Sequence, residues 1–212
     1  MEVENHESVV SGSNQSGRNF SGADFGESRD LTGVNFSCAN LCGTSFSYGY
    51  LGAGEVHTKH HMDNACYSSD LSSANFTSAD LSRSNLYECS LDAADLSYAC
   101  VEHSDLRRAS CLNLIALGAS FNNAHLSATC FDGANLNGAT FVGANCGPTV
   151  IGENTKYSGQ AILGSATFCK ASLCNVDFSG ADLRGVDFSG SNIDGACFDG
   201  ANLEGTVFNS IG

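Results

Sequence analysis

The run FSGADLRGVDFSG occupies residues 178–190, and FDGANLEGTVF occupies residues 198–208. In both runs a large apolar residue recurs at every fifth position, and a small residue usually stands two positions before it. A period of five fits neither an α-helix, which repeats about every 3.6 residues, nor a β-strand, which repeats about every two. It fits a chain that turns the same corner repeatedly.

The same period extends over most of the chain. It begins in a short register at Phe20 and Phe25, runs in a second register from Leu31 to Phe141, and resumes two residues out of phase at Phe168. All 13 Phe fall at the central position and all six Tyr fall elsewhere, so we expect the central position to face inward and Tyr to face outward. The expected core is built on these rings: Phe76, Phe121, Phe131, Phe141, Phe168, Phe178, Phe188, Phe198 and Phe208.

These runs, together with FDGANLNGATFVGAN at 131–145, resemble the A(D/N)LXX motif of the pentapeptide-repeat family. The resemblance covers about residues 18–46 and 68–208. It implies an all-β fold, a right-handed quadrilateral parallel β-helix in which four pentapeptides form one square coil. With coils about 4.8 Å apart, the chain is expected to form a single rod of about nine coils. Residues 1–17 are expected to be an acidic N-terminal segment or cap, and 18–212 the β-helix, interrupted at about 47–67 and 147–162.

Such coils place residues n and n+20 one above the other. Phe168, Phe188 and Phe208 are then expected in one column, with Phe178 and Phe198 in the opposite one, so that large rings occupy one pair of facing walls. Asp or Asn commonly precedes the central residue, where its side chain can accept a hydrogen bond from the turn backbone, and Gly often follows two positions later at the corner. Part of the negative charge is therefore expected to be structural.

The formal charge of −14, from 23 acidic and 9 basic residues, argues against direct binding to nucleic acid and permits a basic protein partner. The N-terminus has no apolar segment typical of a signal peptide, and no stretch is apolar enough to span a membrane, so a cytoplasmic location without membrane contact is expected. No two of the eleven Cys are 20 residues apart, which indicates free thiols, with Cys89, Cys111 and Cys146 as inward fillers.

Three segments depart from the repeat. Residues 47–67, SYGYLGAGEVHTKHHMDNACY, place His61 at a central position, which indicates a projecting loop or a distorted coil. His57, His60 and His61 are weak metal-ligand candidates, because H-x-x-H-H matches no strong ligand spacing; a solvated loop without metal or cofactor is the alternative. Residues 147–162, GPTVIGENTKYSGQAI, contain the only Pro and the phase change, which indicates a short insertion.

The third departure is CLNLIALGAS at 111–120. Here Leu114 occupies the small inward position and Ala116 the central one. A volume-conserving exchange within the core explains this pattern.

Enzymatic activity is not expected, because the chain contains no nucleophile elbow, P-loop, H-E-x-x-H or C-x-x-C motif. Quinolone-resistance members of the pentapeptide-repeat family resemble a DNA duplex in width and charge and bind type II topoisomerases such as gyrase. The resemblance thus implies a non-enzymatic, protein-binding DNA mimic that modulates or protects such an enzyme, with antibiotic resistance as its consequence. A protein-interaction scaffold or effector unrelated to DNA mimicry is the alternative. The outward acids outside the repeat motif are the partner-binding candidates: Glu88, Asp92, Glu102, Asp132, Asp194, Asp199 and Glu204.

Those family members also dimerise through a C-terminal helical segment. In this chain the repeat runs to Phe208 and only NSIG follows, so that route is not expected. A homodimer is instead possible through the last coil, end to end, with four apolar residues at the contact. These are Ile193, Phe198, Leu203 and Phe208.

Overall fold

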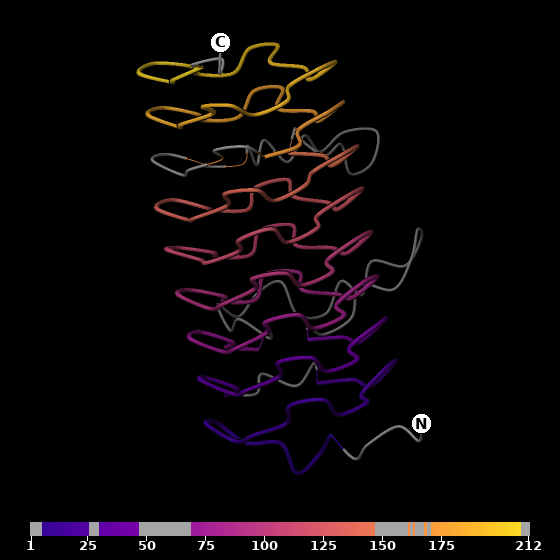
Figure 1. The fold of residues 1–212 in the computed structure, drawn as a ribbon. Helices are drawn as coiled ribbons and strands as arrows, with labels where there is room; N and C mark the ends of the chain where they lie inside the picture. Colours follow the sequence, from indigo (N-terminus) through magenta and orange to yellow (C-terminus); the bar gives the residue numbers. More distant parts are fainter. Residues whose placement is uncertain are drawn as a thin grey trace, which may run out of the picture.

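The computed structural model describes residues 6–25, 30–46, 69–146, 161, 163, 168 and 171–208. In these residues the backbone pairs through isolated parallel bridges, and neither a helix nor a longer strand is present among them. The coils stack into a rod, with residues 6–25 at one end of the stack and residues 191–208 at the other (Figure 1). The molecule is thus a parallel β-helix built from single-residue rungs.

Each coil has four faces, numbered here 1 to 4 in chain order, and each face contributes one bridging residue per coil. The ladder of face 3 joins Asn19, Asn40, Asp80, Cys100, Ser120, Thr140, Ser172 and Asn192. The ladder of face 4 joins Asp24, Ser45, Asn85, Asp105, His125, Asn145, Asp177 and Cys197. The described ladder of face 1 joins Asp30, Asp70, Ser90, Ser110 and Cys130, and then Asp182 and Asn202. That of face 2 joins Asn14, Asn35, Asn75, Asp95, Ile115 and Asn135, and then Asp187 and Val207.

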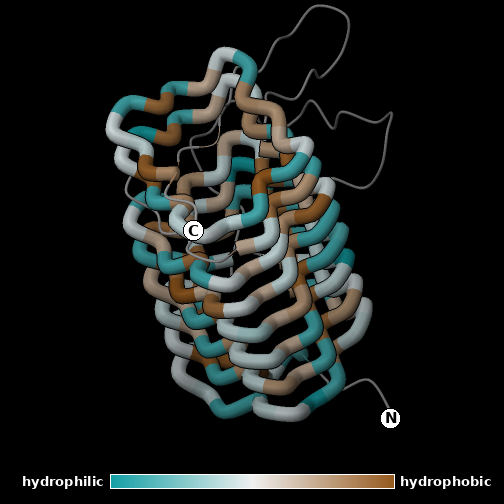
Figure 2. Tube along the Cα trace, turned by 45° about the horizontal axis from the view of Figure 1, so that its top comes forward, coloured by the Kyte–Doolittle hydropathy of each residue, from teal (hydrophilic) through white to brown (hydrophobic). Residues whose placement is uncertain are grey.

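Bridge partners within residues 69–146 are 20 residues apart, as the four-pentapeptide coil predicts. Figure 2 shows the same stack from a raised viewpoint, with apolar and polar residues interspersed along each turn. The ladders of faces 3 and 4 run without a gap through eight rungs each. The coils before and after the interruptions therefore belong to one continuous stack.

The three breaks in the repeat all fall at the same corner, where face 4 leads into face 1. They lie between Phe25 and Asp30, between Phe46 and Ser69, and between Cys146 and Ala161. Across the second break Asp30 pairs with Asp70, forty residues later, so pairing passes directly over the intervening segment. Residues 47–68 and 147–160 themselves, and with them the choice between a loop and a distorted coil, lie outside the described residues.

The corners are left-handed turns. In the described coils the residue two positions after the centre has a φ between +55° and +71°, and thirteen of these described residues are not Gly. The Asp or Asn before the centre accepts a hydrogen bond from the backbone N–H two residues later, as between Asn75 and Thr77 at 2.9 Å or Asp177 and Ser179 at 2.9 Å. Both the Gly corners and the structural role of the short polar side chains are confirmed.

The interior is filled by stacked rings. Phe168 stacks on Phe188 with ring centroids 5.2 Å apart, Phe188 stacks on Phe208 at the same separation, and Phe178 stacks on Phe198 at 5.4 Å. These two columns stand on faces 2 and 4, as predicted. The rings change walls in the middle of the rod, where Phe121 stacks on Phe141 on face 3. Phe131 meets Phe121 edge to face from face 1. The expectation of a single pair of facing walls thus holds from Phe25 to Phe76 and from Phe168 to Phe208, but not in the middle of the rod or at Phe20, which stands on face 3.

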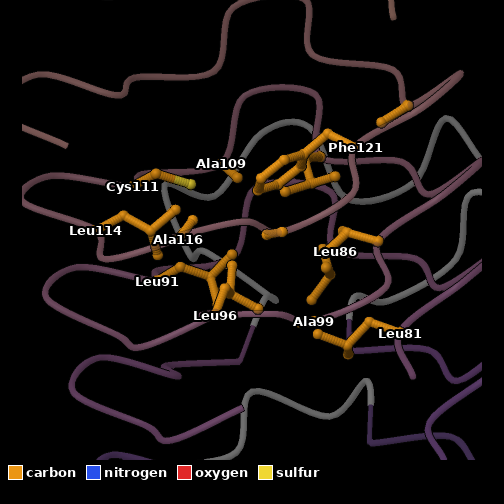
Figure 3. Packing of buried hydrophobic residues seen from close by; sticks show 14 of the residues in the cluster. Leu81, Leu86, Leu91, Leu96, Ala99, Ala109, Cys111, Leu114, Ala116 and Phe121 are labelled. Atoms are coloured by element: carbon orange, nitrogen blue, oxygen red, sulfur yellow. The ribbon is translucent and has the colours of Figure 1, made fainter. Parts of the chain in front are cut away.

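The exchange predicted at 111–120 is present. Leu114 and Ala116 are both fully buried, and they point into the interior above Leu91 and Leu96 of the preceding coil (Figure 3). The larger side chain has moved from the central to the neighbouring inward position, so the core volume is conserved.

The two ends differ in how their rings are covered. At the N-terminal end Val9 is buried and the His6 ring packs edge-on against Phe25 with centroids 5.1 Å apart. At the other end Phe198 is partly buried and Phe208 is 42% exposed. The sequence-based assignment of Phe208 to the core is therefore wrong, because no described coil stacks above it.

Among the residues that the structure describes, no helix is long and apolar enough to cross a membrane.

Candidate protein-binding surface

The seven predicted partner-binding acids lie at three of the four corners of the rod. Asp92, Asp132 and Glu204 follow face 1, Glu102 and Asp194 follow face 3, and Glu88 and Asp199 follow face 4. All seven are outward and exposed or half-buried. The structure does not gather them into one stripe.

Three of these acids are engaged within the rod. Asp92 Oδ1 accepts hydrogen bonds from Ser110 Oγ at 2.6 Å and from the backbone N–H of Leu112 at 3.0 Å. Where Asp or Asn precedes the centre, as at Asn75 and Asp177, it satisfies the turn N–H of its own pentapeptide, but Ser110 is too short for this role. Asp92 thus reaches up from the coil below and replaces the missing turn acceptor.

Glu102 contacts the coil above it in a related way. Its Oε1 accepts from Ser120 Oγ at 2.7 Å and from Asn122 Nδ2 at 3.2 Å. Sequence reasoning missed both cross-coil contacts. The sequence signal was a Ser directly before the central residue of a pentapeptide with an acidic residue eighteen positions earlier, as in Ser110 with Asp92 and Ser120 with Glu102.

Charge separates between the faces of the rod. Faces 1 and 2 of five successive coils, which comprise residues 30–39, 69–79, 90–99, 110–119 and 130–139, contain no Lys, Arg or His. They carry Asp30, Asp70, Asp92, Asp95 and Asp132. Faces 3 and 4 of the same coils carry Arg83, His103, Arg107, Arg108 and His125 among their described residues. In these five coils one side of the rod is therefore acidic without a neutralising cation, whereas Arg184 follows face 1 nearer the C-terminal end and pairs with Asp182 at 2.7 Å.

The cations on face 4 pair with local acids. Arg107 binds Asp105 with both Nε and Nη2, at 2.8 and 2.6 Å, and its guanidinium lies 5.6 Å from the ring centre of Tyr87. Arg108 pairs with Glu88 at 2.9 Å. Burial raises the pKa of Tyr87. Glu88, at this corner, is thus part of a neutralised cluster.

The described thiols are free, and the predicted inward thiols are buried. Burial raises the pKa of Cys89 to about 12 and raises the pKa of Cys111 and Cys146 strongly. These three thiols therefore stay protonated and act as apolar filling. No cluster of three or more metal-ligating side chains occurs in the described part of the chain, and His57, His60 and His61 lie outside it.

Apolar side chains emerge at one place on the acidic side. Tyr98 is 68% exposed, Ile115 40% and Leu112 36%. Sequence reasoning explained the segment 111–120 by its inward residues and overlooked Ile115. The signal was an apolar residue at a ladder position that is polar in most coils.

Comparison with known proteins agrees with this architecture. The pentapeptide repeats family matches in eight copies at residues 11–47, 69–108, 119–147, 159–190 and 171–209. The solved structure of trypsin-treated QnrB1, a plasmid-mediated fluoroquinolone resistance protein, has a TM-score of 0.54 and 18% sequence identity, covering 94% of this chain and 85% of that chain. This likeness shows the fold, a right-handed β-helix rod.

A second solved structure is HetL, a pentapeptide repeat protein involved in heterocyst differentiation regulation from the cyanobacterium Nostoc sp. strain PCC 7120. Its TM-score is 0.45 at 23% identity, covering 93% of this chain and 90% of that chain. A comparison with curated protein sequences gave no significant match. No catalytic family is indicated. With the family matched over most of its length, this chain belongs to the pentapeptide-repeat family.

Proposed function

We propose that this protein is a non-enzymatic DNA mimic that binds a type II topoisomerase such as gyrase in the cytoplasm and modulates or protects it. The observation that supports the proposal best is the absence of Lys, Arg and His from faces 1 and 2 over residues 30–39, 69–79, 90–99, 110–119 and 130–139. A basic groove that holds DNA would meet this side without encountering a like charge. We further infer a single β-helix with about nine square coils, which already includes the Asn14 rung and so begins before residue 18.

The linear charge density of this side is close to that of one DNA strand. Five Asp residues lie within five coils, two of them in residues 90–99 and none in residues 110–119. With coils about 4.8 Å apart, the average is one carboxylate per about 4–5 Å of rod. A single strand of duplex DNA carries one phosphate per about 3.4 Å. The rod thus offers somewhat less charge than one strand, and we expect weaker binding than that of DNA itself at equal contact length.

The fold likeness supports the same partner class. QnrB1 is a fluoroquinolone resistance protein, and the family resemblance described above links quinolone resistance to binding of type II topoisomerases. For this chain, resistance is the expected cellular consequence if the enzyme is shielded from the drug.

The test is direct binding of the full-length protein to purified gyrase by surface plasmon resonance at low and at physiological salt. We expect binding that weakens as salt rises, because exposed carboxylates are screened. Absence of binding at low salt would refute topoisomerase mimicry.

A matched pair of triple variants locates the interface. Asp92→Asn, Asp95→Asn and Asp132→Asn together remove three charges from the acidic side while keeping an acceptor oxygen at each position. Three amide variants on face 3 and its corner remove the same charge elsewhere: Asp80→Asn, Glu102→Gln and Asp194→Asn. The first set is expected to lower the affinity at least about tenfold and the second only slightly. Equal effects of the two sets would mean that the acidic side does not form the interface.

A protein-interaction scaffold unrelated to DNA mimicry is the second candidate. It is favoured by the exposed Tyr98, Ile115 and Leu112, since a phosphate-like surface has no need for apolar side chains. Binding to a partner that persists at high salt distinguishes this function from mimicry.

We also propose that two copies pair end to end through the last coil. Leu203 is 39% and Phe208 42% exposed there, while Ile193 and Phe198 are partly buried. Light scattering after gel filtration tests this, and a monomer at high protein concentration would exclude the dimer.

A further inference from the structure

An apolar patch crosses face 2 in the middle of the rod. It consists of Leu112 at the corner before the face, Ile115 on its ladder, and Leu117 with Tyr98 at the corner after it. The Tyr98 ring lies directly against Gly118, where an added Cβ would stand 3.1 Å from two ring carbons. The 68% exposed Tyr98 thus adds its ring to the row of apolar side chains on the coil above.

This arrangement gives no advantage to the fold. The other described ladder positions of face 2 hold Asn14, Asn35, Asn75, Asp95, Asn135 and Asp187, and Val207 in the last described coil is the other apolar residue. Asn or Asp at this position accepts the N–H of the following turn, whereas Ile has no oxygen that could do so. The Ile side chain is 40% exposed, so it is also not needed to fill the interior. A position that gives up a turn hydrogen bond and exposes an apolar group indicates a binding surface.

Carboxylates lie next to the patch at the corner before face 2 and on the ladder of face 2. Asp92 lies directly below Leu112, and its carboxylate accepts a hydrogen bond from the Leu112 backbone N–H. Asp132 lies directly above, and its backbone carbonyl accepts a hydrogen bond from the N–H of Asn113. Asp95 bridges to Ile115 from the coil below. Faces 1 and 2 of these three coils, residues 90–99, 110–119 and 130–139, include no Lys, Arg or His.

We propose that this patch is a docking surface for a protein segment that places apolar side chains on Tyr98, Leu112 and Ile115 and presents Lys or Arg to Asp92, Asp95 and Asp132. The apolar contact supplies desolvated area, and the surrounding carboxylates orient the segment and select its charge. A segment with alternating basic and apolar side chains satisfies both requirements.

The charges argue against other occupants. A second copy docking through the same patch would bring Asp92, Asp95 and Asp132 of both copies together, and like charges across an interface oppose association. An anionic membrane surface would be repelled by the same carboxylates. A basic protein segment is the occupant that the surface complements.

The inference rests on the proposed function only in that both describe a protein-binding rod with its interface on the acidic side. It does not require the partner to be a topoisomerase. A test with peptides is therefore independent of gyrase, and its failure leaves the gyrase measurement unaffected.

The probe is a short fluorescein-labelled amphipathic peptide of Lys, Leu and Ala, titrated with the full-length protein at physiological salt and followed by anisotropy. Two control peptides carry Ser in place of Leu, or Glu in place of Lys. We expect the Lys–Leu peptide to bind at least about tenfold more tightly than either control. Loss of Leu removes the apolar contact, and replacement of Lys reverses the complementary charge.

The protein variant Leu112→Ser with Ile115→Asn is expected to weaken binding of the Lys–Leu peptide about tenfold. It keeps the fold, because Asn also occupies the face 2 rungs at 75 and 135. Val142→Ser is the matched control, since Val142 is 37% exposed but follows face 3. It should leave binding unchanged.

Three outcomes would overturn the proposal. The first is that the Lys–Ser peptide binds as tightly as the Lys–Leu peptide, which would reduce the site to charge alone. The second is equal peptide affinity for the wild type and the Leu112→Ser, Ile115→Asn variant. The third is that the peptide does not bind the wild type, while the wild type self-associates in light scattering or co-sediments with neutral lipid vesicles and the Leu112→Ser, Ile115→Asn variant does not.

Discussion

The left-handed corners predict that one substitution has opposite effects at two adjacent residues. Ala93 is exposed at a corner and has a φ of +55°, whereas Ala94 is buried at the small inward position. We expect Ala93→Gly to stabilise the protein and Ala94→Gly to destabilise it.

The magnitudes follow from the two environments. A residue with a Cβ in the left-handed region destabilises the folded state by about 1–2 kcal/mol, and glycine removes this strain. Glycine also raises the entropy of the unfolded chain, which lowers stability by about 0.5–1 kcal/mol. The net effect of Ala93→Gly should therefore be a stabilisation of about 0.5–1 kcal/mol. Ala94→Gly removes a buried methyl group, which lowers stability by about 0.8 kcal/mol. Adding the same 0.5–1 kcal/mol for the unfolded-state entropy of glycine gives a total destabilisation of about 1.3–1.8 kcal/mol. The two variants should therefore differ by about 2 kcal/mol.

Urea unfolding followed by circular dichroism measures this difference. With an m-value of about 2 kcal/mol/M, the two midpoints should lie about 1 M apart on opposite sides of the wild-type midpoint. Ala128→Gly, at a φ of +61°, is a second corner variant and should behave like Ala93→Gly. Equal destabilisation at both Ala93 and Ala94 would refute the view that the corners carry conformational strain.

Three further outcomes are expected. Phe76→Ala should lower the free energy of unfolding by about 3–5 kcal/mol, because the ring is fully buried. Phe208→Ala should lower it by less than half as much, because Phe208 is 42% exposed. Similar urea midpoints for the two variants would contradict this difference in burial. The pKa of Cys89 rises from 9.0 in the unfolded chain to about 12 in the folded protein, so the thiol ionises first in the unfolded chain. Stability should therefore fall between about pH 9 and 12, by up to about 1.4 kcal/mol per pH unit. That slope should be smaller by about this amount in Cys89→Ala, and an unchanged slope would exclude the thiol as its source. Asn75→Ala should lower stability by about 0.5–1.5 kcal/mol, because it removes the acceptor of the Thr77 N–H. Asn75→Asp should lower it less, because Asp keeps an acceptor oxygen, and thermal unfolding measures both variants.

The sequence was sufficient to predict the inside of the rod. Phe121 and Leu126 face inward for the same reason, since each pentapeptide contributes one large side chain to a closed interior. The corner at Gly133 was equally predictable, because a φ of +70° favours glycine. Local requirements that recur in every repeat thus leave a periodic signal.

The outside of the rod was predicted less well, because outward residues are not under the same repeated constraint. The seven candidate acids were chosen one at a time, whereas the separation of charge appears only when alternate blocks of ten residues are assigned to opposite sides. For residues 69–146 this assignment was possible from the 20-residue stacking. The same period also assigns residues 30–46 to these faces, since Asp30 and Asp70 are two periods apart. That the coils of Asp30 and Asp70 are adjacent depends on how many residues the stack excludes. No periodicity gives that number.

The common position of the three breaks has a consequence for how the chain can change in length. Each break begins after face 4 and ends before face 1, while the ladders of faces 3 and 4 continue through all eight rungs. A segment added at this corner changes the register of no ladder, so its cost is mainly loop closure, about 0.6 kcal/mol for each doubling of its length. Between Ser127 and Ala128, the same corner of an uninterrupted coil, a reporter peptide or a small domain should be accepted without loss of the stack. Along this one edge, the number of residues in the protein is independent of the number of coils.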